Sequence, residues 1–367
     1  MLIAATHTHT APAPADFFGA GQARDYIEEM LRPAACRAVR EAHERCAEVS
    51  LKVGDAQESG LAFIRRYWTR EGHVVTNPPK GASNVEGPED EPDHTVRVFA
   101  FERNGSVVGL IVCAANHCDT IGGNLISADW PGLMIRRLRE QLGPVPILYL
   151  NGFAGDVNHF DPKVLRHQAN YQEAEHLGDG YAAYALEALQ GAQPAGEQVV
   201  ARRATVTAPL RKIPPEAITR AREIVARTPL RDSSRLTAEE LAKGDPAVER
   251  IFAQELLRLA EGLSVKSEEE VVIAALALGG HALVFFPGEP FTALARAVRQ
   301  RSPFLSTTPV ELYEHYFGYI PMPEHFERGG YETLSTEHNR LAPQAGATLV
   351  DAAVELLESI RMVSSSY

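Results

Sequence analysis

Four possible metal ligands each follow an apolar, strand-like run of the sequence. His7 and His9 come after one such run, His117 after a second and Glu289 after a third. In open α/β sheets the carboxyl ends of strands meet at one crevice, so ligands that lie far apart in the sequence can converge there. Zinc accepts imidazole nitrogens and carboxylate oxygens, and a catalytic zinc site keeps about three protein ligands and a water. The pattern indicates a metal-dependent hydrolase.

The ligand pattern rests on the combination rather than on any single motif. Residues two apart in a strand point to the same side, so His7 and His9 would project together from the end of a strand over residues 2–6. A His-x-His pair alone is a weak signal, because polar residues are common at strand ends. His117 ends a long apolar run, and Glu289 stands between two prolines that fix the direction of the chain. Together the four residues favour one shared site.

A polar loop, Gly155-Asp-Val-Asn158, follows a short apolar run over residues 145–150. Such a loop can bring backbone amides and a polar side chain to an active centre. Equally, Asp156 or Asn158 can cap the N-terminus of a helix, and the sequence leaves both interpretations open. The chain has no Gly-x-Ser-x-Gly, no Walker loop, no Gly-x-Gly-x-x-Gly after a strand and no His-Glu-x-x-His. Their absence disfavours a serine hydrolase, an NTPase, a Rossmann dehydrogenase and a zincin.

The composition fits one large globular unit. The 367 residues are 45% hydrophobic and 23% charged, which is enough apolar material for a sizeable core. A net charge of −12 argues against nucleic-acid binding, which needs basic patches. The four cysteines form no CxxC pair. No apolar run approaches the ~20 residues of a membrane span, and no signal peptide is evident. We therefore expect a cytoplasmic protein without an integral membrane segment, and the sequence has no feature that indicates its oligomeric state.

Hydrophobic periodicity predicts an α/β fold, with a mixed sheet core flanked by helices. Residues 96–102 and 107–116 form a hairpin through Asn104-Gly105, the strongest two-residue turn signal. Residues 72–94, rich in Gly, Pro, Asn and Asp, predict a long loop. Residues 213–262 predict a helical insertion that packs as a hairpin against the sheet. Residues 269–278 and 282–286 form a second hairpin through Gly279-Gly280. The remaining helices are expected over residues 25–48 (packed on one face), 131–141, 173–189, 291–301 and 341–361, and a further strand over 145–150.

Five motifs, in order and at similar spacing, resemble the neutral/alkaline, non-lysosomal ceramidase family, in particular its bacterial-type members. They are Ala5-Thr-His-Thr-His-Thr10, Asn116-His117, Gly155-Asp-Val157, Pro287-Gly-Glu289, and Gly318-Tyr-Ile320 with Gly330-Tyr-Glu332. The resemblance spans essentially the whole chain and corresponds to the family's N-terminal catalytic domain. It implies an amidase in which a zinc-held water cleaves an N-acyl bond, as the family cleaves ceramide to a fatty acid and sphingosine.

The resemblance also implies roles for individual residues. It implies one Zn²⁺ ion held by four side chains: His7, His117, Glu289 and Tyr319. It implies three groups that bind and polarise the scissile carbonyl: His9, Arg65 and Tyr331. Arg65 is matched only through Arg65-Arg66, because Ile64 stands where the family has Asn. A tyrosine ligand would be a phenolate, which a divalent cation favours although tyrosine titrates near 10 in water.

Three departures from the family accompany these matches. Asn158 stands where ceramidases have Ser, so the role of that serine does not transfer, and Asn158 remains a candidate catalytic residue on its position alone. The chain ends soon after Arg361, before the family's immunoglobulin-like domain. Family members also carry a segment with a core strand before the first His motif. We therefore expect a single ceramidase-like catalytic domain over residues 1–367, and an upstream coding segment of several dozen codons.

The expected function is a zinc-dependent amidohydrolase that acts on a small-molecule N-acyl substrate, which need not be a sphingolipid. One alternative is a metal phosphoesterase, because His and carboxylate ligands at strand ends also suit two-metal sites. A second metal would need further ligands near Asp119, Asp129 or Asp156. The other alternative is an inactive or metal-free binding protein of the ceramidase type.

Overall fold

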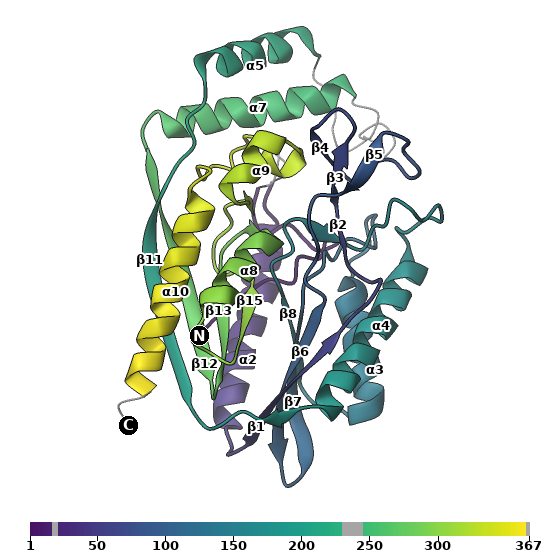
Figure 1. Cartoon of the computed structure of the whole chain (residues 1–367), viewed down its shortest axis with the longest axis vertical. Coiled ribbons are helices and arrows are strands. Elements are labelled where there is room, and N and C mark those ends of the chain that lie inside the picture. The colour runs from purple at the N-terminus through teal and green to yellow at the C-terminus, as the bar shows by residue number, and fades with distance from the viewer. Residues whose placement is uncertain (17–20, 230–244, 365–367) are drawn as a thin grey trace.

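Two mixed β-sheets pack face to face in the computed structural model, which describes residues 1–16, 21–229 and 245–364 (Figure 1). The five-stranded sheet has the order β10 (Gln193–Pro194), β1 (Ser50–Gln57), β6 (Thr95–Arg103), β7 (Ser106–Ala114) and β8 (Ile147–Asn151). The four-stranded sheet has the order β11 (Val199–Pro209), β12 (Glu268–Leu278), β13 (His281–Phe285) and β15 (Ser306–Val310). In each sheet the last pair is parallel and the others are antiparallel.

Helices cover the outer face of each sheet, so the molecule has four layers (Figure 1). The five-stranded sheet is covered by α3 (Asp129–Leu142) and α4 (Tyr171–Gln190), and the four-stranded sheet by α8 (Thr292–Arg301) and α10 (Ala345–Ser364). Along β6, Val96 and Val98 pack toward α3 and α4, whereas Phe99 packs toward the other sheet. A strand that is buried on both faces has a nearly continuous run of apolar residues, which is why such strands can be predicted from the sequence.

Both predicted hairpins are confirmed. Asn104 and Gly105 have φ angles of 53° and 76°, as the turn between β6 and β7 requires. Gly279, between β12 and β13, has φ 60°, and a Cβ there would lie 1.6 Å from the carbonyl oxygen of Ala195. Only glycine fits at that position. The long edge strand β11 and the strands β1 and β15 were not predicted.

Several short strands hold the loops that meet at the ends of the two sheets. They are β2 (Phe63–Ile64) paired with β9 (Val157–Asn158), β14 (Glu289–Pro290) paired with β16 (Tyr319–Ile320), and β3 (Arg66–Thr69) between β4 (Val74–Thr76) and β5 (Val85–Pro88). The prediction of a continuous loop over residues 72–94 is therefore wrong, because β4 and β5 lie within it. Strands of only three or four residues, set among Gly and Pro, are too short to show the alternation of apolar and polar residues from which a strand is predicted.

The predicted helical insertion consists of α5 (Pro215–Arg227) and α7 (Pro246–Leu263), which pack together through Ala221, Ile224 and Ala253. Part of the predicted range, residues 230–244, lies outside the described residues. The pair lies across one end of the molecule, on the side of α9 (Pro323–Arg328) (Figure 1). The expectation that it packs against the sheet is wrong: α7 packs instead on residues 331–337, through the ring of Phe252 and the carboxylate of Glu255.

Two expectations near the N-terminus also need correction. Residues 2–6 do not form a strand, because only Ala4 makes a bridge, to Tyr313. The predicted helix is present as α1 (Arg24–Tyr26), the π-helical turn η1 (Ile27–Leu31) and α2 (Arg32–Glu44), but none of its residues is buried. Its expected packed face is therefore not found. Among the described residues, no helix has the length and apolar composition to cross a membrane.

Candidate metal centre and active site

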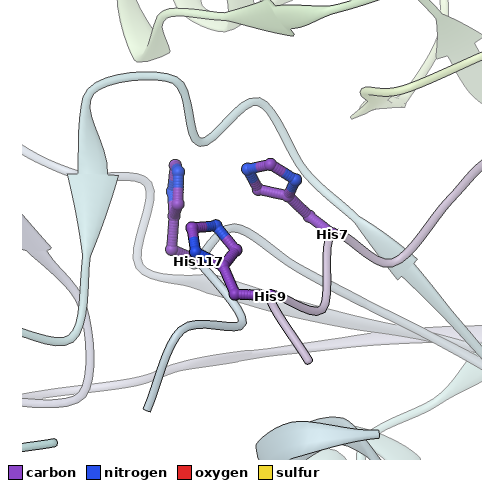
Figure 2. Close-up of side chains that lie close together, drawn as sticks. All are labelled: His7, His9 and His117. Atoms are coloured by element: carbon purple, nitrogen blue, oxygen red, sulfur yellow. The ribbon is translucent and has the colours of Figure 1, made fainter. Parts of the chain in front are cut away.

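Three histidines from two distant segments meet at one point (Figure 2). The ring centroids of His7 and His9 are 4.9 Å apart, those of His7 and His117 are 4.7 Å apart, and the candidate ligand nitrogens of all three lie within 4.8 Å of one another. His7 has a φ of 66°, in the left-handed region. The rings of His7 and His9 are therefore brought together by a turn of the backbone at His7. The alternation of side chains along a strand, which the sequence suggested, is not the cause. His117 follows the end of β7.

The carboxylate of Glu289 completes this group. Its Oε2 lies 3.2 Å from Nε2 of His7 and 3.4 Å from Nε2 of His117. Oε2 of Glu289 and Nε2 of His7 are buried, yet neither makes a hydrogen bond of proper geometry. Two tetrahedral ligand atoms, each about 2.0–2.1 Å from a zinc ion, lie about 3.3 Å apart. The two measured separations match that spacing, so the donor set fits a single ion.

The charges of this group also suit a cation. Burial lowers the pKa of His7, but the Glu289 carboxylate outweighs burial and raises it to about 9. Burial and the guanidinium of Arg65 lower the pKa of His117 to about 4. Burial raises the pKa of Glu289, but His7 and His117 outweigh it and hold that pKa well below its usual range. His117 is therefore neutral, and the His7–Glu289 pair shares a proton that a divalent ion would displace.

Arg65, which the sequence matches only through Arg65-Arg66, lies directly beside this group. Its Nη1 is 3.2 Å from Nε2 of His117, and its Nε forms an ion pair of 2.8 Å with Oε1 of Glu332. Its guanidinium also lies over the ring of Tyr319, 4.9 Å from the centroid. The segment is held by the pairing of β2 with β9 and by the bond from the Arg65 amide to the carbonyl of Asp156.

Three tyrosines border the centre. Tyr319 pairs with Glu289 across β14 and β16, and burial raises the pKa of its phenol well above the usual value. Tyr331 packs edge-on against Tyr319 with centroids 5.7 Å apart. Tyr316, to which sequence reasoning gave no role, donates a hydrogen bond of 2.7 Å to Oε1 of Glu289. The sequence feature that could have pointed to Tyr316 is the tyrosine-rich run that ends at Tyr319.

A small pocket with a cavity volume of about 30 Å³ opens beside these tyrosines. Its lining residues are Phe252, Tyr316, Tyr319, Tyr331, Thr336, His338 and Asn339. That volume has room for about two water molecules and lies far below the range for small-molecule sites, about 300–1,000 Å³. The walls are mostly aromatic with a few polar groups, so they offer a largely apolar surface beside the centre. Phe252 comes from α7, so the helical insertion contributes one wall.

Asn158 lies apart from the histidine group. Its Nδ2 donates to Oδ1 of Asn77 at 2.8 Å, and its Oδ1 accepts from the amide of Phe160 at 3.0 Å. Asn77 in turn donates its amide to the carbonyl of Arg65. Asn158 therefore supports the chain around Arg65, with both ends of its amide engaged. Asp156 accepts from the amide of Thr292, so it caps α8 from a remote segment.

The three aspartates that could have supplied a second metal are engaged elsewhere. Asp129 accepts from the amides of Ile121 and Trp130, and Asp156 accepts from Thr292. Asp119 faces Nδ1 of His159 at 3.0 Å. In the described part of the chain, His7, His9 and His117 are the one set of three or more potential ligands whose ligand atoms all lie within 4.8 Å of one another.

Solved structures share this architecture. The crystal structure of a neutral ceramidase from Pseudomonas aeruginosa matches with a TM-score of 0.69 at 16% identity, covering 98% of this chain and 61% of that one. The chain has the ceramidase fold. A structure of a ceramidase complexed with C2 matches equally, with a TM-score of 0.69 and 16% identity, over 98% of this chain and 62% of that one. The chain thus spans less than two thirds of the ceramidases it matches. No protein-family model matches the chain, and no curated protein matches it in sequence.

Proposed function

We propose that the protein is a zinc-dependent hydrolase that cleaves the amide bond of a small N-acyl substrate. The observation that carries the proposal is the spacing of 3.2 and 3.4 Å between Oε2 of Glu289 and the nitrogens of His7 and His117. The ceramidase fold supports an amide-bond hydrolase, although a fold alone does not fix the activity.

The side chains divide into ion-holding and carbonyl-binding groups. A zinc ion would be held by His7, His117 and Glu289, with Tyr319 as the fourth ligand, and His9 faces the same point. When bound, zinc lowers the pKa of water toward about 7 and so supplies a nucleophile at neutral pH.

The second set of groups stabilises the oxygen on which negative charge develops. Arg65 and Tyr331 can donate to that oxygen, and His9 can bind it from the exposed side of the centre. One such donor contributes about 3–4 kcal/mol to the lowering of the barrier. Tyr316 fixes the Glu289 carboxylate and does not need to touch the substrate.

The surface beside Tyr319 and Tyr331 supports this substrate class. Its aromatic walls suit the apolar part of an N-acyl compound. Because the chain spans only part of the ceramidases, ceramide is one candidate among N-acyl compounds. No observation favours phosphate-ester hydrolysis, since no second group of ligands is found among the described residues.

The test is a substrate screen with zinc-loaded protein. The panel runs from short- and long-chain ceramides to N-acyl amino acids and simple anilides, with phosphate monoesters as a separate arm. Release of the free carboxylic acid should depend on zinc and should be lost in His117→Ala. Turnover of phosphate esters alone, or no turnover of any N-acyl compound by fully loaded protein, would overturn the proposal.

A further inference from the structure

We propose that Thr76 and Glu332 form a positioning pair that aims two of the three carbonyl-binding groups, Arg65 and Tyr331, at the substrate. The inference rests on the proposed function. Neither Thr76 nor Glu332 is expected to touch the substrate or the ion; each acts through another residue.

Glu332 is fully buried and holds two arginines with one carboxylate. Its Oε1 lies 2.8 Å from Nε of Arg65, and its Oε2 accepts from Nη1 of Arg66 at 2.7 Å. The relative exposure of its side chain is 0%. The Arg65–Glu332 contact does not have hydrogen-bond geometry, but a buried carboxylate with a cation near each oxygen has little freedom, so its charge holds the Arg65 guanidinium in place.

The hydroxyl of Thr76 links Glu332 to Tyr331. It donates to Oε2 of Glu332 at 2.7 Å and accepts from the backbone amide of Tyr331 at 3.1 Å. Because a threonine hydroxyl has one hydrogen to donate, the first bond leaves its oxygen free to accept the second. One hydroxyl on β4 therefore sets the position of the short 3₁₀ turn η3 (Tyr331–Thr333), which carries Tyr331.

The pair matters most when His117 holds an ion. Nε2 of His117 has a single lone pair, which now accepts from Nη1 of Arg65 at 3.2 Å. An ion coordinated by His117 would use that lone pair, so the hydrogen bond from Arg65 to His117 would be broken when metal binds. The ion pair with Glu332 does not involve His117, so it can still hold Arg65 beside the carbonyl.

Glu89 provides a matched control. It too is a buried carboxylate on Arg66, with its Oε2 2.5 Å from Nε of Arg66 and its side chain 2% exposed. Among the described residues, its carboxylate accepts hydrogen bonds from Arg66 and Arg328, and from neither Arg65 nor Tyr331. Glu332→Gln and Glu89→Gln therefore each remove one buried charge from the same arginine, and only the first also releases Arg65.

The experiment compares Glu332→Gln, Glu89→Gln, Thr76→Val and Thr76→Ser with the wild type. Each zinc-loaded variant is assayed for kcat and KM on the best N-acyl substrate, for zinc content and for melting temperature. A displacement of about 1 Å at a reacting group can cost about 10²-fold in rate. We expect kcat to fall by about that factor in Glu332→Gln with KM and zinc content little changed. Glu89→Gln should lower the melting temperature to a similar extent and leave kcat near that of the wild type.

Thr76 tests the same pair without removing a buried charge. Thr76→Val should lower kcat, and Thr76→Ser, which keeps the hydroxyl, should restore it. Equal kcat losses in Glu332→Gln and Glu89→Gln, or equal activity in the valine and serine variants, would overturn the inference.

Crystal structures of the zinc-loaded wild type and Glu332→Gln give a readout that does not depend on activity. The Arg65 guanidinium should be displaced in the variant, and an unchanged position would reject the pair's role. A wild type without N-acyl hydrolysis refutes the proposed function, while this structural comparison still decides whether Glu332 positions Arg65.

Discussion

Tyr316 and Glu289 are joined by a hydrogen bond of 2.7 Å from the phenol hydroxyl to Oε1 of the carboxylate. The other oxygen, Oε2, is the one that faces His7 and His117. Because the carboxylate is planar, a fixed Oε1 also fixes Oε2. Tyr316 therefore orients the carboxylate that we propose as a zinc ligand, a role that outer partners of metal ligands commonly play.

Replacing Tyr316 by Phe removes this orientation and keeps the ring. We expect the zinc affinity of Tyr316→Phe to fall by about 10–100-fold, the usual effect of losing an outer hydrogen bond at a metal site. Competition with a chelator of known affinity measures it. Tyr313→Phe is the control, because the Tyr313 hydroxyl is buried without a hydrogen bond of proper geometry. Equal zinc affinity in all three proteins would show that the bond does not orient Glu289.

The ligand set itself can be tested by metal analysis. His117→Ala should lose most of its zinc, because His117 lies within reach of both His7 and Glu289. Glu289→Ala should lose zinc as well, whereas His9→Ala should retain it and lose activity. The reverse result, with zinc lost from the His9 variant and kept in the Glu289 variant, would make the three histidines the ligand set.

Tyr331 should act on the transition state and leave the metal in place. Tyr331→Phe removes one hydroxyl donor, so we expect kcat to fall by roughly 10²–10³-fold with zinc content intact. The exposed position of Tyr331, at 38% relative exposure, makes a folding defect a poor explanation for such a loss. Loss of zinc from this variant would instead identify Tyr331 as a ligand in place of Tyr319.

The sequence predicted the parts of the fold that carry a clear period or turn signal. The hairpin through Asn104-Gly105 and the apolar strand β8 are of this kind, since local chemistry determines them. The layering of the two sheets was not predicted. It depends on which strand faces align, as when Phe99 of β6 packs toward Phe285 of β13, and no local signal encodes that choice.

The candidate site was predictable as a set of residue types but not as a network. His7, His117 and Glu289 could be named because strand ends converge and because ordered motifs resemble a family. Thr76 could not be named, since it lies on a three-residue strand within an expected loop. Tyr316 lies in a tyrosine-rich run of the sequence, but it is the pairing of β14 with β16, which begins at Tyr319, that brings this run beside Glu289.

A final prediction concerns Asp119 and His159, whose Oδ1 and Nδ1 lie 3.0 Å apart. Nε2 of His159 lies 2.6 Å from the carbonyl of Gln168 and donates to it, so Nδ1 carries a hydrogen only when the ring is charged. Burial lowers the pKa of His159, but Asp119 outweighs burial and raises it above 6.5. Burial raises the pKa of Asp119, but His159 and the neighbouring histidines outweigh it and hold that pKa below its usual range. The pair is therefore an ion pair near neutral pH.

The sign of the pH dependence follows from these two shifts. The contribution of His159 is complete below its unfolded pKa near 6.5 and is lost as pH rises through its raised folded value. The contribution of Asp119 is present above its unfolded pKa near 3.9 and is lost only in stronger acid. Asp119→Asn should thus lower the free energy of unfolding by roughly 1–3 kcal/mol at about pH 6, because the partly exposed pair is partly screened, and by much less in alkaline solution, above the raised folded pKa of His159. Urea unfolding of both proteins in the presence of a chelator measures the difference without a metal contribution. A difference that stays constant across this pH range would mean that His159 does not change its charge there.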